Sequence, residues 1–160
     1  MDVGASKLVL AEFSADKSGI PALINYGVGR LNVDPEKETD SSSYIVATIR
    51  EIMGEQGIKP APLYMSMSGQ SVFPRYVRLP PVARDKVEQI IRYEAEQNVP
   101  FPIDEVVWDY QLISGGETEE LNAMLVAVKL ENITRLTDCV LAAGLEPEIV
   151  DVAPMALYNV

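Results

Sequence analysis

The sequence predicts an α/β (α+β) fold, because segments with strand-like alternation and segments with helical spacing follow one another along the chain. The clearest helical spacing lies in residues 44–53, 87–95 and 133–141, and β-prone apolar segments separate these stretches. The chain has 160 residues, of which 48% are hydrophobic and 23% charged. This is ordinary globular composition, and the length suffices for one core or two small lobes.

The first third of the chain predicts two strands, at residues 7–14 and 21–33, joined by a turn at 17–19. Residues 33–40 are polar and predict a surface loop. Gly27-Val28-Gly29 resembles the start of a dinucleotide fingerprint, but position 32 is Asn and no helix follows directly. These glycines therefore indicate local structure rather than a nucleotide site.

Helix boundaries follow from capping residues and prolines. Asp40 or a serine at 41–43 is suited to cap the first helix, and Gly57 to end it. Pro100 and Pro102 end the second helix, because proline lacks a backbone donor. The remaining predictions, in chain order, are strands at 63–68 and 72–79, a helix at 84–98, strands at 106–113 and 121–130 joined at Gly115-Gly116, a helix at 132–143 ended by Gly144, a strand at 148–152 and a helix beginning at 154.

Charge and composition exclude several classes of function. The formal charge is −11, so we expect no nucleic-acid partner, because neutralising phosphates requires a basic surface. The absence of His excludes His-based catalytic triads and His metal sites. A single cysteine, Cys139, allows no intramolecular disulfide and points to a reducing compartment. We see no signal peptide and no apolar run of about 20 residues, and we expect a cytoplasmic protein without direct membrane insertion.

Asp2-Val3-Gly4-Ala5-Ser6 is the first candidate site. An Asp, a flexible Gly and a hydroxyl residue in a turn can present amides and a hydroxyl to a phosphate while the Asp faces a hydrated Mg²⁺. Asp, Gly and Ser are also the residues that any tight turn favours. The motif alone leaves both interpretations open.

Two other features have an ordinary structural interpretation beside a functional one. Glu94 lies on the apolar stripe of the second predicted helix, and a salt bridge to Arg75 or Arg78 would explain it. The aromatic residues Phe101, Trp108 and Tyr110 fit a peptide-binding cluster or ordinary core packing. Neither a nucleophile with its base nor a cluster of metal ligands emerges from the sequence.

The segment 75–113 closely resembles the PilM family of type IV pilus assembly proteins. The specific parts are Arg78-Leu79-Pro80, Tyr93-Glu94-Ala95-Glu96-Gln97, Val99-Pro100-Phe101-Pro102 and Asp109-Tyr110-Gln111. Residues 2–6 are similar to the family's first phosphate motif, and residues 142–145 and 150–152 to its return strand. The resemblance is colinear over essentially the whole chain.

The resemblance implies the first lobe of an actin-like, FtsA-like ATPase fold. We expect a ribonuclease-H-like subdomain at 1–75 and 147–160, with a small α+β subdomain inserted at 76–146. The second lobe has no counterpart in the sequence, and both ends look clipped, so we expect a fragment of a longer protein. The family often has Lys seven positions after the motif Asp, where this chain has Val9.

By the same resemblance, we expect a cytoplasmic scaffold that is peripheral to the inner membrane through its partners. The expected partners are the N-terminal tail of a PilN-like bitopic protein and other pilus platform proteins. Position suggests Arg75, Tyr76 and Arg78 for tail binding. Asp2, Gly4 and Ser6 are the residues expected to bind ATP, and Asp2 Mg²⁺, in a longer parent. We expect neither catalysis nor a cofactor in this chain alone; the alternatives are an actin-like ATPase and an FtsA-like division filament component.

Overall fold

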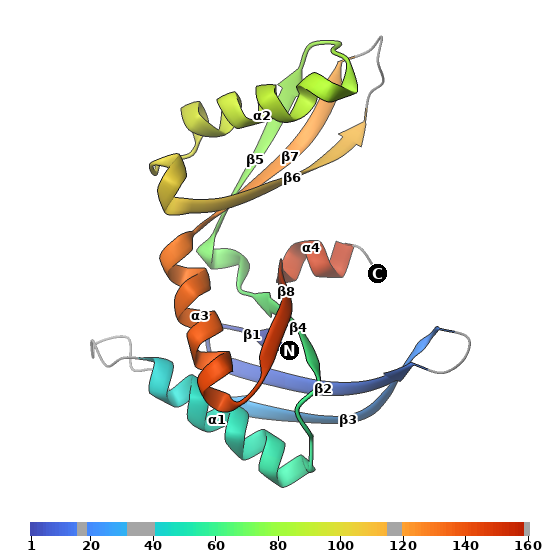
Figure 1. Cartoon of the computed structure of the whole chain (residues 1–160), viewed down its shortest axis with the longest axis vertical. Helices are drawn as coiled ribbons and strands as arrows, with labels where there is room; N and C mark the ends of the chain where they lie inside the picture. The colour runs from blue at the N-terminus through green and yellow to red at the C-terminus, as the bar shows by residue number, and fades with distance from the viewer. Residues whose placement is uncertain (16–18, 32–40, 115–119, 159–160) are drawn as a thin grey trace. The chain divides into compact units, whose positions relative to one another are not determined.

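The computed structural model describes residues 1–15, 19–31, 41–114 and 120–158. They form two compact units, Met1–Gln70 with Thr134–Val160, and Ser71–Ile133 (Figure 1). Each unit combines a sheet with helices, so the predicted α/β (α+β) class is confirmed. The turns expected at 17–18 and 115–116 and the loop expected at 33–40 lie outside the described residues.

The first unit is built on a five-stranded mixed sheet of order β3-β2-β1-β4-β8. β1 pairs antiparallel with β2 and parallel with β4, and β4 is parallel to β8. β2 and β3 form an antiparallel pair with an irregularity between Glu12 and Phe13. The strands are β1 Asp2–Val3, β2 Lys7–Ala15, β3 Pro21–Arg30, β4 Pro62–Met67 and β8 Glu146–Val152.

Helices α1 (Ser41–Gln56) and α3 (Leu130–Ala143) are neighbours in Figure 1. The Arg50 guanidinium donates a hydrogen bond of 2.5 Å to the carbonyl oxygen of Ala142, in the last turn of α3. The Cys139 thiol donates to the carbonyl oxygen of Ser42 across 3.7 Å. These two contacts fix α1 beside α3.

Close packing between α1 and β3 explains two of the glycines. A Cβ built on Gly29 would overlap Thr48 Cγ2, and a Cβ built on Gly27 would overlap Ile52 Cγ2. Both α1 residues are buried. Gly27 and Gly29 therefore have a structural role, as the sequence indicated, because they allow α1 to pack closely on β3.

Both glycines that were predicted to end helices directly follow one, Gly57 after α1 and Gly144 after α3. Gly57 and Gly144 have φ values of +67° and +93°, which favour glycine. The amide of Leu145 donates to the Val140 carbonyl at 3.1 Å, and that of Gly144 to the Leu141 carbonyl at 2.9 Å. This pair of hydrogen bonds is a Schellman motif, which satisfies carbonyls that the helix leaves unpaired.

The two faces of the five-stranded sheet differ. Leu8, Leu10 and Met65 are buried on the face that α1 covers. Because side chains alternate along a strand, their neighbours in sequence lie on the opposite face. That face keeps large apolar side chains exposed, at Phe13, Leu23, Tyr26, Val28, Tyr64 and Ile149.

The second unit is a three-stranded antiparallel sheet of order β5-β7-β6 with α2 packed on one face. Its elements are β5 Val72–Leu79, α2 Arg84–Asn98, β6 Val106–Ser114 and β7 Leu121–Lys129. The core consists of the buried residues Val77, Leu79, Val87, Ile91, Ala95, Val99, Val106, Leu121, Ala123, Leu125 and Ala127.

The aromatic residues of this unit belong to its packing. Phe101, Trp108 and Tyr110 are partly buried against the core cluster, which is the structural alternative considered for them. Phe73 and Phe101 meet edge to face with ring centroids 5.9 Å apart. Glu94 Oε2 accepts a hydrogen bond of 3.0 Å from the Asn98 side chain on the same helix. Arg75 and Arg78, the salt-bridge partners expected for Glu94, lie on β5.

Some boundaries and elements differ from expectation. The compact units divide at 70/71 and 133/134, so most of α3 belongs to the first unit, whereas the expected insertion ended at residue 146. β1 and the short helices η1 (Gly69–Ser71) and η2 (Ile103–Glu105) were not predicted, because segments of two or three residues carry no periodic signal. The terminal helix α4 spans Ala153–Tyr158. Among the described residues, no helix is long and apolar enough to cross a membrane.

Candidate functional site

Asp2 lies within β1, between β2 and β4. It faces Val9 on β2 and Ser66 on β4. Its Oδ1 accepts a hydrogen bond of 2.6 Å from the Ser66 hydroxyl in a partly buried setting. The Met1 carbonyl accepts a bond of 2.8 Å from the Ser66 amide, which extends the pairing of the two strands. The strand therefore holds the Asp2 carboxylate in a defined position.

The remainder of the candidate phosphate motif forms the turn between β1 and β2. The Gly4 amide donates to the Lys7 carbonyl at 2.9 Å, and the Ser6 carbonyl accepts from the Leu31 amide at 2.9 Å. A Cβ on Gly4 would lie 3.2 Å from the Lys7 carbonyl oxygen, so the turn is tight at this point. Ala5 and Ser6 are exposed. Asp2 thus lies on the strand and Gly4 and Ser6 in the turn that follows it, with Ser6 exposed.

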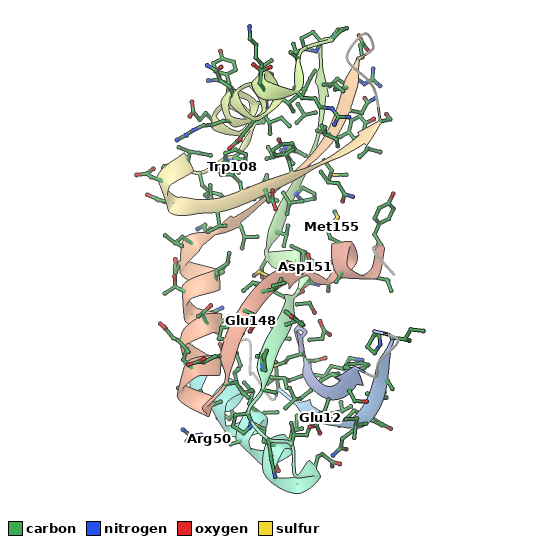
Figure 2. The ribbon with its side chains drawn as sticks, turned by 45° about the vertical axis from the view of Figure 1, so that its right-hand side comes forward. Glu12, Arg50, Trp108, Glu148, Asp151 and Met155 are labelled. Atoms are coloured by element: carbon green, nitrogen blue, oxygen red, sulfur yellow. The ribbon has the colours of Figure 1, made fainter. Side chains whose placement is uncertain are left out.

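Parallel strand pairing adds two residues to this site. Ser66 faces Asp2 on one side and Asp151 on the other, so Asp2, Ser66 and Asp151 form one row across β1, β4 and β8. The Val152 amide donates a hydrogen bond of 2.6 Å to Asp151 Oδ1. Figure 2 shows Asp151 on β8, close to the start of α4. We call these three residues the polar row.

The polar row brings oxygen donors together but does not form a complete metal site. Among the described residues, no group of three or more His, Cys, Asp or Glu side chains converges on a point. A Mg²⁺ ion commonly takes one or two carboxylates and completes its shell with water and phosphate oxygens. The Asp2 carboxylate is a donor of that kind.

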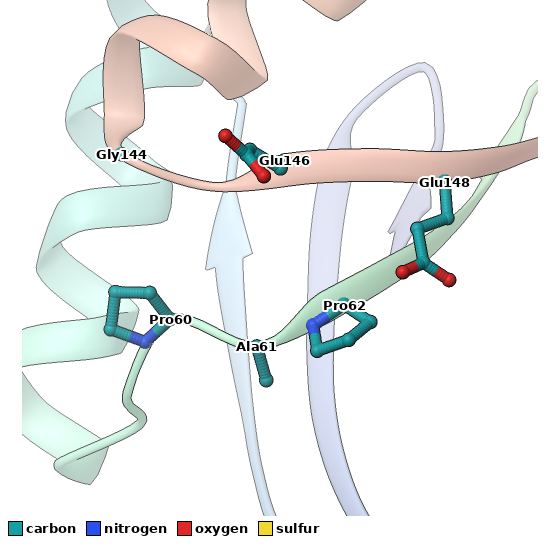
Figure 3. Close-up of a pocket in the computed structure, with 6 residues that line it drawn as sticks. All are labelled: Pro60, Ala61, Pro62, Gly144, Glu146 and Glu148. Carbon is teal, nitrogen blue, oxygen red and sulfur yellow. The ribbon is translucent and has the colours of Figure 1, made fainter.

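A pocket of about 400 Å³ lies elsewhere in the first unit. It is lined by Pro60, Ala61, Pro62, Gly144, Glu146 and Glu148 (Figure 3). Pro62 and Glu146 are the first residues of β4 and β8, whereas Ser66 and Asp151 lie near the other ends of these strands. Ligands of open α/β sheets bind outside the carboxyl ends of the strands, so the pocket is distinct from the polar row.

The residues expected to bind a partner tail all lie on β5. Arg75, Tyr76 and Arg78 are exposed, and among the described strands β5 pairs with β7 only. Val77 and Leu79 point into the core beneath α2, so Tyr76 and Arg78 lie on the opposite face. Arg75 lies on the α2 side, with its guanidinium carbon 5.3 Å from the centroid of the Phe73 ring. The structure therefore groups Tyr76 with Arg78 and separates Arg75 from them.

The face that carries Tyr76 and Arg78 is mostly apolar at its centre. Tyr76 faces Met124 on β7, and Met124 faces Gln111 on β6. In the next row Val126 lies between Pro74 and Asp109. We call this surface the open face and define it by Pro74, Tyr76, Arg78, Asp109, Gln111, Asn122, Met124 and Val126.

Sequence reasoning missed Ser66, Asp151 and the β6–β7 part of the open face. Asp151 interrupts an apolar strand, which is a signal of a special role. The neighbours of Asp2 could not be found in this way, because Asp2 and Ser66 are 64 residues apart in the chain.

Comparison with known proteins agrees with this architecture. The family described as type IV pilus assembly protein PilM matches residues 1–160. A solved PilM–PilN type IV pilus biogenesis complex contains a similar chain, with a TM-score of 0.78 and 27% identity over 98% of this chain and 48% of that one.

A second similar structure shares the fold alone. It is the cytoplasmic domain of EpsL, an inner-membrane component of the type II secretion system of Vibrio cholerae, with a TM-score of 0.58 and 15% identity. The match covers 94% of this chain and 53% of that chain. The present chain thus spans about half the length of both solved chains. Since the PilM match extends over every residue from 1 to 160, the chain belongs to the PilM family of type IV pilus assembly proteins.

Proposed function

We propose that this chain is a binding module of a type IV pilus assembly platform that holds the cytoplasmic N-terminal tail of a PilN-like bitopic protein. The similarity to the PilM chain of a PilM–PilN complex, over 98% of the present chain, carries the proposal. The first unit corresponds to the ribonuclease-H-like subdomain and the second to its insertion. The tail partner keeps the module on the cytoplasmic side of the inner membrane, together with other platform proteins.

The open face of the second unit is the proposed tail site. Tyr76 is 54% exposed, which is high for an aromatic side chain beside apolar neighbours. Pro74 lies in the middle of β5 and has no amide proton, so the outer edge of β5 is poorly suited to adding another strand. We therefore place the tail across the face, held by side chains, rather than along the edge of the sheet.

The chemistry of the open face defines the tail that fits it. An apolar tail side chain would pack between Tyr76, Met124 and Val126, which supplies most of the binding free energy. An acidic tail group would pair with the exposed Arg78. Such an arrangement needs only a short extended segment, as is common in peptide recognition.

A titration of the chain with a fluorescent peptide that copies the PilN-like tail tests the proposal. Tyr76→Ala and Arg78→Glu should each weaken binding about tenfold, because each removes a central contact. Tyr93→Ala is the matched control, since Tyr93 is 61% exposed on α2. Arg84→Glu is the charge-matched control on the same helix. Arg75→Glu should have a smaller effect than Arg78→Glu, because Arg75 lies on the α2 side of the sheet.

Several results would count against this site. Equal binding of a scrambled tail would remove sequence recognition altogether. If Tyr93→Ala weakened binding as much as Tyr76→Ala, the open face would not be the site. A folded chain that binds no tail peptide would contradict the proposed function itself.

The polar row favours a second candidate function, nucleotide binding by a longer protein that contains this lobe. The supporting observation is the bond of 2.6 Å that holds Asp2 to Ser66, with Asp151 in the next position of the row. In that role Asp2 would hold a hydrated Mg²⁺ ion, and Gly4 and Ser6 would contact phosphate.

Titration with fluorescent ATP in the presence and absence of Mg²⁺ tests this candidate. A PilM-length protein should bind in a Mg²⁺-dependent way and lose binding on Asp2→Asn, whereas the 160-residue chain alone should not bind. Binding that is insensitive to Asp2→Asn would refute the assignment.

A further inference from the structure

The two edges of the five-stranded sheet are built differently. β8 carries Glu146, Pro147, Glu148 and Asp151, and charged residues and proline protect an edge against added strands. β3, the other edge, is ten residues long, and Arg30 is its single charged residue. Its one proline, Pro21, is its first residue. Within the described part of the chain, β3 pairs with β2 only, so no strand occupies its outer edge. The Tyr26 amide donates a hydrogen bond of 2.9 Å to Oδ1 of the neighbouring Asn25, a local bond that an added strand would have to replace if it paired with this amide.

Exposed apolar side chains line β3 on the face away from α1. Leu23, Tyr26 and Val28 are 55%, 59% and 57% exposed. Phe13 faces Leu23 across the β2–β3 pair and is also exposed. Adjacent exposed apolar side chains on a strand edge are a feature of interaction surfaces.

The flank of α1 above this edge is acidic. Thr48 and Ile52 lie over Gly29 and Gly27, which places α1 directly above β3. Arg50 points the other way, to α3. At 100° per residue, Glu51 and Glu55 fall on the flank opposite the α3 contact. Both are exposed, so two carboxylates lie on the side of α1 that overlooks the free edge of β3.

We propose that the free edge of β3 binds an extended segment of a partner protein as a sixth strand, and that this segment alternates basic and apolar side chains. Successive side chains of an added strand point to opposite faces. Those on one face meet Glu51 and Glu55, and those on the other meet Tyr26 and Val28. This surface lies in the first unit and does not depend on the tail site at Tyr76 and Arg78.

A second copy of the chain is a poorer occupant than an extended partner segment. Paired strands lie about 4.8 Å apart, whereas packed helices need about 8–10 Å between axes. Since α1 sits directly over β3, pairing β3 with its own copy would force two α1 helices into the same space. It would also bring the acidic flanks of the two copies together.

The test uses a fluorescent peptide of alternating valine and lysine, titrated at physiological ionic strength. The double variant Glu51→Lys/Glu55→Lys should weaken its binding about tenfold or more, because attraction becomes repulsion. The matched control Glu146→Lys/Glu148→Lys makes the same charge change at the protected edge and should leave binding within a factor of about two. An alternating valine–glutamate peptide should instead bind the Glu51→Lys/Glu55→Lys variant more tightly than the parent chain.

Main-chain pairing is tested separately. A valine–lysine peptide with N-methyl groups on alternate amides should lose binding, and hydrogen exchange of β3 amides should slow only with the unmethylated peptide. Equal binding of the methylated peptide, or equal weakening by the β8 control, would overturn the proposal. Self-association of the chain that the peptide displaces would overturn it in favour of a dimer edge. The PilN-like tail titration on the same variants should be unchanged, so failure of this proposal is distinguishable from failure of the tail site.

Discussion

The contact between α1 and β3 gives the sharpest stability prediction. Replacing Gly29 by Ala places a methyl group against Thr48 Cγ2 and 3.3 Å from Ile52 Cδ1. Thr48 is 7% exposed and β-branched, so it cannot rotate away without cost. The helix must lift from the sheet. Overpacking of this kind costs about 1–3 kcal/mol.

A second glycine in the same packed pair provides the control. Gly54 lies in α1, and a Cβ there would meet nothing within 4 Å. Gly54→Ala should stabilise the protein by about 0.5–1 kcal/mol, because alanine loses less backbone entropy in a helix. The same chemical change should therefore have opposite signs at two positions of one helix–strand pair.

Cys139 supplies a local assay, since it is the chain's single cysteine and is buried in α3 against α1. Its rate of thiol labelling across a urea series reports opening of the first unit. With a urea dependence of about 2 kcal/mol/M, the midpoint for Gly29→Ala should fall by roughly 0.5–1.5 M. Adding Thr48→Ser removes the clashing methyl and should recover much of the loss.

The reasoning would be refuted if Gly29→Ala were as stable as the parent chain or stabilised it like Gly54→Ala. It would also be refuted if the Gly29→Ala/Thr48→Ser double variant showed no coupling, because residues in contact should not be additive. Either result would mean that the glycines of β3 are not required for the approach of α1.

Three further predictions follow from the packing and the chain start. Ile91→Ala should destabilise the second unit by about 2–5 kcal/mol, read from Trp108 fluorescence, because Ile91 is fully buried; a loss below that range would contradict the core assignment. Arg50→Ala should cost about 0.5–1.5 kcal/mol in Cys139 labelling, because the Ala142 carbonyl loses its donor, and Arg50→Lys should recover part of it. Burial, partly offset by the nearby carboxylate of the next residue, lowers the pKa of the Met1 α-amino group below its ordinary value of 8.0. The unfolded state then binds more protons just below pH 8, so the free energy of unfolding should rise with pH until about 8. Because the chain has no His, few other groups titrate there. Acetylation of the α-amino group should flatten this rise, and an unchanged slope would refute it.

The helices and most strands could be predicted because their periodicity is local. The apolar spacing in α1 and α2, with Gly57 and the prolines after Asn98, determines those elements within a few residues. The period of two also separates Arg75 from Arg78, since residues three apart on a strand point to opposite faces.

The polar row and the units' boundaries could not be predicted in the same way. β1 joins β4 and β8 through parallel pairing between distant segments, and no local pattern specifies which strands become neighbours. The motif makes Asp2 a candidate from the sequence, whereas Ser66 and Asp151 come beside it only through this register. α3 begins directly after β7 without a loop, which left no sequence signal for a boundary.

The pairing of β5 with β7 brings the two ends of the second unit together. Val72 faces Val128, so the chain enters the second unit and leaves it at adjacent points. A module whose two ends meet can be added to, or removed from, a surface turn without stretching the host. The second unit can therefore be exchanged as a cassette between related proteins, with the host sheet keeping its order and only the surface of the cassette changing.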